Sequence, residues 1–139
     1  MKFYIASSLQ NIEQVRALSR LLKDAGWAQT FDWTLNGPEQ ATDLETLQCI
    51  AKRELEGVSA AEVFILLTPQ GRGAHTELGM ALALRKEVYL CHRDDAYFRC
   101  DEKTSAFYWL PQIKRLVGGT EEIARALLNA PRPAAGARS

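Results

Sequence analysis

Short apolar runs alternate with segments of helical periodicity along most of the chain. The apolar runs predict five strands, at residues 2–6, 28–33, 62–67, 87–91 and 113–117. The run at 62–67, EVFILL, is apolar without alternation. This pattern is typical of a central parallel strand that is covered on both faces.

Apolar residues at helical spacing predict four helices between and after these strands. The helical segments are 12–25, 44–58, 75–86 and 120–129. Asn11 and Thr120 are the expected N-caps of the first and last helices, and Gly26 ends the first one. Thr42 and Glu45 form a capping-box pattern at the start of the second helix.

Strands that alternate with helices predict one α/β domain over residues 1–129. The expected fold is a doubly wound, five-stranded parallel sheet in three layers, of the flavodoxin or Rossmann-like kind, with right-handed crossovers. A chain of 139 residues is long enough to bury a core of its own. The last segment, APRPAAGARS at 130–139, predicts a disordered tail.

Composition excludes several classes of function. Seventeen basic residues balance seventeen acidic ones, so no broad electrostatic field attracts nucleic acid or an anionic membrane. No apolar run approaches the ~18 residues of a membrane span, and no leader precedes the first strand, so we expect a soluble cytoplasmic protein. Three cysteines without metal-ligand spacing and only two histidines argue against a metal site.

The carboxyl ends of the predicted strands bring polar residues to one edge of the sheet. In parallel sheets the ligand crevice lies outside this edge. The first strand delivers Ser8, the second delivers Asp32 and Trp33, and the third delivers the turn at 68–73. Asp32 and Trp33 could hold or stack on an aromatic base, or they could simply pack.

Glu77 falls at the same edge, because the predicted helix 75–86 begins there. Gly71 and Gly73 allow a tight turn and a close approach to a ligand. A carboxylate in the first helical turn is favoured by the helix dipole by ~0.3–1 kcal/mol. Beside a pocket it could attack an electrophilic carbon, such as C1′ of a nucleoside, and form a covalent ester. Spacing alone favours the simpler interpretation, in which Glu77 only complements the dipole.

Three stretches resemble the nucleoside 2-deoxyribosyltransferase-like family. GAHTELGMALALRKEVYL, at 73–90, resembles the catalytic segment, whose glutamate is the nucleophile; the resemblance assigns that role to Glu77. KFYIASS, at 2–8, resembles the first strand, whose tyrosine orients the nucleophile, here Tyr4. ELEGVSAAEVFILL, at 54–67, resembles a segment in which an acidic residue contacts the sugar or base. Glu54 holds that position, where an aspartate is more usual.

The resemblance also implies a substrate class. Ser8 matches a serine that binds the 5′-phosphate in the nucleotide-hydrolysing branch, and Gly71, Arg72 and Gly73 would lie near the same phosphate. We therefore expect cleavage or transfer of the N-glycosidic bond of a nucleoside or its 5′-monophosphate, with hydrolysis of the monophosphate favoured. No metal or organic cofactor is implied. The alternatives are a nucleoside 2-deoxyribosyltransferase, a TIR-like NAD glycohydrolase and a non-catalytic nucleotide sensor.

The segment 93–112 does not align with the family, and it contains three adjacent aromatic residues, Phe107, Tyr108 and Trp109. Adjacent aromatic residues are costly to leave in water, so either their own chain or a neighbouring subunit is expected to cover them. In the family this region tends to reach a neighbouring subunit. We therefore expect a homodimer or a dimer of dimers, with a small-molecule nucleoside or nucleotide as the substrate.

Overall fold

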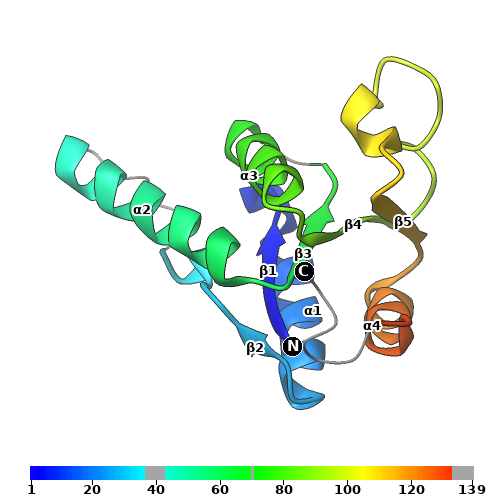
Figure 1. Ribbon diagram of the computed structural model, residues 1–139, viewed down its shortest axis with the longest axis horizontal. Coiled ribbons are helices and arrows are strands. Elements are labelled where there is room, and N and C mark those ends of the chain that lie inside the picture. Colours follow the sequence, from blue (N-terminus) through cyan, green and yellow to red (C-terminus); the bar gives the residue numbers. More distant parts are fainter. Residues whose placement is uncertain (37–42, 70, 133–139) are drawn as a thin grey trace.

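The computed structural model contains one five-stranded sheet between two layers of helices (Figure 1). It describes residues 1–36, 43–69 and 71–132. The strand order is β2-β1-β3-β4-β5, and every pairing is parallel. The strands are β1 (Lys2–Ala6), β2 (Ala28–Gln29), β3 (Val63–Leu67), β4 (Glu87–His92) and β5 (Ile113–Val117). The predicted doubly wound parallel fold is confirmed.

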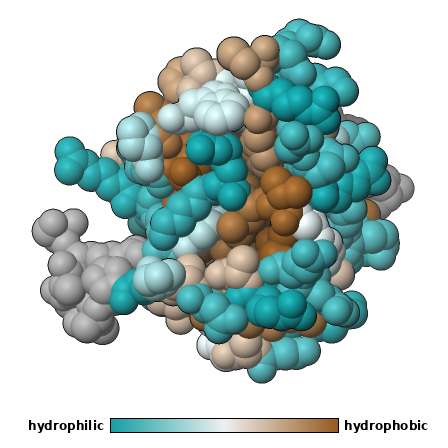
Figure 2. Space-filling view, turned by 90° about the vertical axis from the view of Figure 1, so that its right-hand side faces the viewer, coloured by the Kyte–Doolittle hydropathy of each residue, from teal (hydrophilic) through white to brown (hydrophobic). Residues whose placement is uncertain are grey.

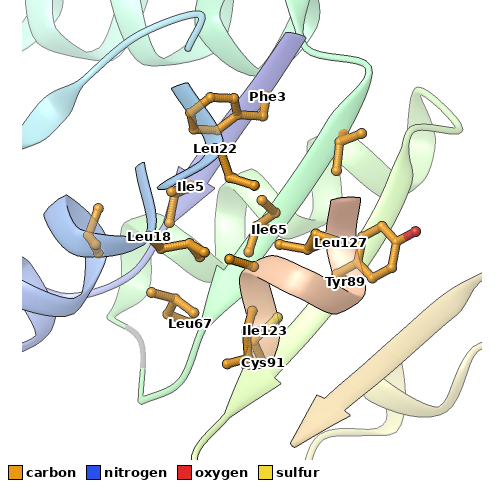
Figure 3. Close-up of a cluster of buried hydrophobic side chains, with 13 residues drawn as sticks. Phe3, Ile5, Leu18, Leu22, Ile65, Leu67, Tyr89, Cys91, Ile123 and Leu127 are labelled. Atoms are coloured by element: carbon orange, nitrogen blue, oxygen red, sulfur yellow. The ribbon is translucent and has the colours of Figure 1, made fainter. Parts of the chain in front are cut away.

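Two separate cores lie on the two faces of this sheet. Helices α1 (Ile12–Asp24) and α4 (Thr120–Asn129) cover one face, where Phe3, Ile5 and Ile65 point into the cluster that Figure 3 shows. Helices α2 (Leu44–Ala60) and α3 (Arg72–Ala83) cover the other face. All five residues of β3 are buried, as its unbroken apolar run predicts for the central strand.

Strand β2 is shorter than predicted, because only Ala28–Gln29 of the expected 28–33 pairs with β1. Beyond this point the side chains make other bonds. The hydroxyl of Thr30 donates to the Gly57 carbonyl at 2.7 Å, and Asp32 accepts from the backbone N–H of Thr34 at 3.0 Å. The chain then forms the short 3-10 helix η2 (Trp33–Asn36). An edge strand with a neighbour on only one side is readily ended in this way.

The helix caps differ from the predictions at several positions. Asn11 stands at the N-cap of α1, but its side chain does not cap the helix. Asp43 caps α2 by accepting from the Thr46 N–H at 2.8 Å, whereas Thr42 lies outside the described residues. Gly119, rather than Thr120, is the N-cap of α4. Gly26 follows α1 with a φ of +96°, which fits its predicted role as the end of that helix.

The residues after α4 are held against the sheet as far as Arg132. The Arg132 guanidinium donates to the Glu87 carboxylate at 2.8 Å and lies 4.9 Å from the centroid of the Trp27 ring. Both members of this ion pair are largely buried. The prediction of a disordered tail is therefore corrected for residues 130–132. The planar Arg132 guanidinium binds a carboxylate and lies over an aromatic ring, and these contacts hold the segment in place. Residues 133–139 lie outside the described part.

None of the helices in the described part of the chain is long and apolar enough to cross a membrane.

Candidate active site

Helix α3 begins at Arg72, three residues earlier than the predicted 75–86. Gly71 is its N-cap in an extended conformation, and Arg72 and Gly73 are its first two residues. Glu77 therefore lies in the second turn and not in the first, where the sequence placed it. Because the dipole effect falls off within the first turn, the dipole contributes less to the ionisation of Glu77 than expected.

The side chain of Glu77 is buried and faces the sheet. Its exposed fraction is only 7%, and Ala74, Leu78 and Ala81 share its face of the helix. The Tyr4 hydroxyl donates a hydrogen bond to Oε2 of Glu77. The structure therefore brings together the two residues to which the family resemblance assigns catalysis.

Tyr4 itself is held in place by the strands around it. It lies on β1 opposite Phe64 of β3, and the two rings are nearly parallel, with centroids 6.0 Å apart. Its side chain is fully buried. A fully buried ring that lies against a neighbouring ring has little freedom to turn, so the Tyr4 hydroxyl holds the Glu77 carboxylate in one orientation.

Burial controls the protonation of this pair. Desolvation raises the pKa of Glu77 to about 8; the Tyr4 hydrogen bond acts in the opposite sense, and the charge of Glu54 raises the pKa further. Burial also raises the pKa of Tyr4, and the neighbouring Glu77 adds to this rise, so the phenol stays a hydrogen-bond donor. Burial likewise raises the pKa of Glu54, which is half-buried on α2.

The arrangement has a definite chemical capacity. A carboxylate with little hydration and one fixed hydrogen bond keeps Oε1 for another partner, because the bond from Tyr4 goes to Oε2. Such an oxygen can act as a nucleophile or stabilise a cationic centre. Among the described residues, no cluster of three or more His, Cys, Asp or Glu could hold a metal ion.

Ser8 lies at the carboxyl edge of the sheet, next to the turn between β3 and α3. Its hydroxyl donates to the Pro69 carbonyl at 3.2 Å, and the Asn11 amide donates to the same oxygen at 2.9 Å. Ser7 donates to the Leu67 carbonyl at 2.7 Å. These bonds tie the end of β1 to the turn that leads to α3, so Ser8 and the start of α3 lie along one edge.

Gly71, Arg72 and Gly73 are exposed at the start of α3, as the predicted site requires. Backbone N–H groups in the first turn of a helix have no partner within the helix, and they point out of its end. A methyl group built on either glycine would meet no atom within 4 Å. This helix end is therefore open to a ligand.

Asp32 and Trp33 make contacts of structural kinds. Asp32 accepts from both the N–H and the hydroxyl of Thr34, and it lines a cavity with Arg16 on the α1 side of the sheet. The Trp33 indole donates to the Ile5 carbonyl at 2.6 Å and packs against both cores. Glu54, by contrast, is close enough to Glu77 and Tyr4 to raise both pKa values.

A family model described as nucleoside 2-deoxyribosyltransferase matches residues 3–123, most of the chain. This chain belongs to the nucleoside 2-deoxyribosyltransferase family. Membership makes it an enzyme of the N-glycosidase or transferase type. The matched range contains Tyr4, Glu54 and Glu77, so the site described above lies within the part that defines the family.

Solved structures agree with this deoxyribosyltransferase fold. The CMP N-glycosidase BcmB of Clostridium botulinum is 18% identical, with a TM-score of 0.61 over 91% of this chain and 98% of that one. A 2-deoxyribosyltransferase of Bacillus psychrosaccharolyticus is 20% identical, with a TM-score of 0.65 over 89% and 90% of the two chains. None of the curated proteins matches the chain.

Two residues near this deoxyribosyltransferase-family site were given no role by the sequence analysis. Gly57 on α2 is buried against the Tyr4 ring. His75, on α3, bonds the Tyr108 hydroxyl at 3.0 Å. Glycine inside a helix costs about 1 kcal/mol relative to alanine. Its presence within a predicted helix is a signal that could have drawn attention to Gly57. No comparable signal in the sequence links His75 to Tyr108, because the two residues lie in separate segments and no local pattern relates their positions.

The raised pKa of Glu77 predicts how stability depends on pH. Because the folded protein holds the Glu77 proton up to about pH 8 and the unfolded chain releases it near 4.5, the folded state binds more protons between these values. The contribution of Glu77 to stability is therefore full below pH 4.5 and is lost as the pH rises to 8. Urea unfolding of the wild type and of Glu77→Gln across this range measures the effect.

We expect the free energy of unfolding of Glu77→Gln to fall less between pH 5 and pH 8 than that of the wild type. Glutamine has nearly the same shape as glutamic acid and does not titrate. The difference between the two proteins in how their unfolding free energies depend on pH therefore reports the ionisation of Glu77. Identical slopes in the two proteins would show that Glu77 is already ionised in the folded protein at neutral pH.

Proposed function

We propose that this enzyme hydrolyses the N-glycosidic bond of a nucleoside 5′-monophosphate, with Glu77 as the nucleophile. The observation that carries the proposal is the buried hydrogen bond between Tyr4 and Glu77 in a chain of this family. It holds one poorly hydrated carboxylate at a fixed angle beside the carboxyl edge of the sheet. That geometry suits attack on a single carbon of a bound sugar.

The reaction would proceed in two displacements. Oε1 of ionised Glu77 forms a bond to C1′ while the bond from C1′ to the base nitrogen breaks, and the base leaves with the electron pair and takes up a proton. Water then attacks C1′, displaces the Glu77 carboxylate and loses a proton, which releases the sugar phosphate. The cationic character of C1′ in both transition states favours a nearby anion. Glu54, on the neighbouring helix, would contact the sugar or base.

The preference for a monophosphate rests on the edge of the sheet beside this carboxylate. Ser8 and the open N-terminus of α3 lie along that edge, and they offer a hydroxyl and backbone N–H groups. Arg72 is exposed in the first turn of α3 and could add a charge-assisted bond. These are the ingredients of a phosphate site, and a nucleoside transferase has no need of them.

Transfer of the sugar to a second base is the main competing function. It uses the same first step, and one of the structural neighbours is described as a 2-deoxyribosyltransferase. The other is described as a CMP N-glycosidase, so the comparisons support both outcomes of the second step. A TIR-like NAD glycohydrolase and a non-catalytic sensor stay as alternatives that the same substrate panel addresses.

Substitution of Glu77 is expected to abolish base release while the protein stays folded. Glu77→Gln keeps an acceptor for Tyr4 but cannot form the ester, so kcat should fall by more than about a thousandfold. Free base is measured by chromatography after incubation with nucleosides, their monophosphates and NAD. Glu45→Gln, at an exposed acid in the first turn of α2, serves as the matched control and should keep full activity. Wild-type turnover by a well-folded Glu77→Gln protein would refute the mechanism.

The phosphate proposal predicts a specificity difference. We expect kcat/KM for a deoxynucleoside 5′-monophosphate to exceed that for the deoxynucleoside, and Ser8→Ala and Arg72→Ala to reduce this ratio. Charge-assisted bonds contribute about 1.5–3 kcal/mol, so Arg72→Ala should cost about tenfold or more with the monophosphate only. Equal rates for the two substrates, or a new nucleoside when free base is added, would favour the transferase.

We also propose that the enzyme is a homodimer. The aromatic run of the segment 93–112 divides between two environments. Tyr108 is buried in its own chain, whereas Phe107 and Trp109 keep exposed fractions of 62% and 45%. Phe107 lines a cavity of about 600 Å³ that extends along α3 to Leu82. Apolar residues gather in a patch with a polar surround on the side that Figure 2 shows.

Helix α2 adds further apolar surface that its own chain leaves uncovered. Leu44, Leu47 and Leu55 are all exposed on this helix, which projects from the body of the domain (Figure 1). Exposed apolar patches of this kind are typical of surfaces that meet a partner. A second copy of this chain is the occupant that the family resemblance favours.

Light scattering at micromolar concentration should therefore give the mass of a dimer or of a dimer of dimers. Phe107→Glu and Leu47→Glu place a charge in the proposed contact and should shift the protein towards the monomer. Glu13→Lys, a charge change on the opposite face in α1, is the control. A wild-type monomer at this concentration would count against the assembly.

A further inference from the structure

Gly57 is a buried glycine near the end of α2, three residues after Glu54. A methyl group at this position would lie 2.8 Å from Cβ of Phe31 and 3.1 Å from two atoms of the Tyr4 ring, Cδ2 and Cε2. Real Cβ atoms essentially never approach another atom to under 3.0 Å. Any larger residue therefore requires the Tyr4 ring, Phe31 or α2 to move.

The Tyr4 ring has little freedom to retreat from such a methyl group. At Tyr4, β1 pairs with β3, the face of the ring is nearly parallel to the Phe64 ring, and its hydroxyl is bonded to Glu77. Movement of the ring therefore displaces the hydroxyl. The backbone of α2 is also fixed at this point, because the Thr30 hydroxyl donates to the Gly57 carbonyl at 2.7 Å.

We propose that Gly57 is a positioning residue: the missing side chain lets α2 close against the Tyr4 ring, and this contact aims the Tyr4 hydroxyl at Glu77. The atoms nearest to the missing side chain belong to Phe31 and Tyr4, so in this proposal Gly57 acts through Tyr4. The geometric claim stands by itself. Its meaning for catalysis rests on the proposed function, in which Glu77 is the nucleophile.

Loss of the Tyr4 hydrogen bond changes the pKa of Glu77, which a general loss of stability does not do. The hydrogen bond from Tyr4 favours the ionised form of Glu77 and lowers its pKa. A substitution that turns the hydroxyl away removes this effect, so the Glu77 carboxyl keeps its proton to higher pH. In the proposed reaction the rising limb of the pH–rate profile moves to higher pH as well, because the nucleophile is the ionised form.

The test measures the titration of the Glu77 carboxyl carbon by NMR in four proteins: wild type, Gly57→Ala, Tyr4→Phe and the double variant. We expect the titration midpoint to rise above the wild-type value in Gly57→Ala and in Tyr4→Phe. The double variant should titrate like Tyr4→Phe, because Gly57 has no hydroxyl left to aim. Such non-additivity is the signature of two residues that act as one unit.

Two further variants control for unrelated effects. Gly119→Ala adds the same methyl group at the start of α4, where its nearest neighbour is 3.7 Å away, and it should leave the Glu77 titration unchanged. Thr30→Val removes the bond to the Gly57 carbonyl without adding atoms between α2 and the Tyr4 ring. It should therefore raise the titration midpoint of Glu77 by less than Gly57→Ala does. It also keeps the proposal testable if Gly57→Ala does not fold.

An unchanged midpoint in a folded Gly57→Ala protein, or in Thr30→Val if only that variant folds, would overturn the proposal. So would an additional shift in the double variant over Tyr4→Phe, because Gly57 would then act by another route. The titration does not require turnover. If no substrate is cleaved by the wild type, the proposed function fails, and the NMR result still decides the role of Gly57.

Discussion

The hydrogen bond between Tyr4 and Glu77 joins two segments that lie 73 residues apart, and it is the contact on which the site depends. A buried carboxyl with no cationic partner within the described part of the chain would ordinarily give up its charge to avoid the cost of desolvation. Here the hydrogen bond from the Tyr4 phenol offsets part of the desolvation cost. The part that is not offset leaves the pKa of Glu77 raised, at about 8. The carboxyl therefore lies close to its point of ionisation at neutral pH, where a bound cationic centre can shift it to the ionised form.

The fold supplies the constraints that make this one bond possible. Strand β1 pairs with β3 at Tyr4, and β3 places Phe64 against the Tyr4 ring. The connection from β3 to α3 is tied to the end of β1 by bonds from Ser7, Ser8 and Asn11. Because the core under α1 and α4 is separate, the site is built on one face of the sheet while the other face supplies packing (Figure 3).

Much of the fold follows from the sequence because burial leaves a strong periodic signal. β3 is apolar without interruption, and it lies in the centre with all five residues buried. The prediction fails where competing local bonds decide the structure. Thr30 and Asp32 end β2 early, and the glycines around Arg72 suggested a turn although the chain is already helical there.

The site was accessible to sequence reasoning only in part. Spacing along the chain could place Glu77 at the carboxyl edge, but it could not choose between a helix-start acid and a nucleophile. The proposal of a nucleophile rests on the family resemblance. Asp32 was expected at the pocket at the end of a strand, but the strand ends at Gln29, and Asp32 bonds Thr34 and lines a cavity beside α1. Gly57 was missed because its importance comes from a close approach between α2 and β1, which no local pattern records.

In the proposed mechanism Glu77 becomes covalently bonded to the sugar. Its most direct test is mass spectrometry of the protein after incubation with a substrate whose C2′ carries fluorine, which slows the second displacement because it destabilises the cationic transition state. We expect each active chain to gain the mass of the sugar moiety and the modified peptide to contain Glu77, with no adduct on Glu77→Gln. Stoichiometric base release with the sugar bonded to another residue would contradict it.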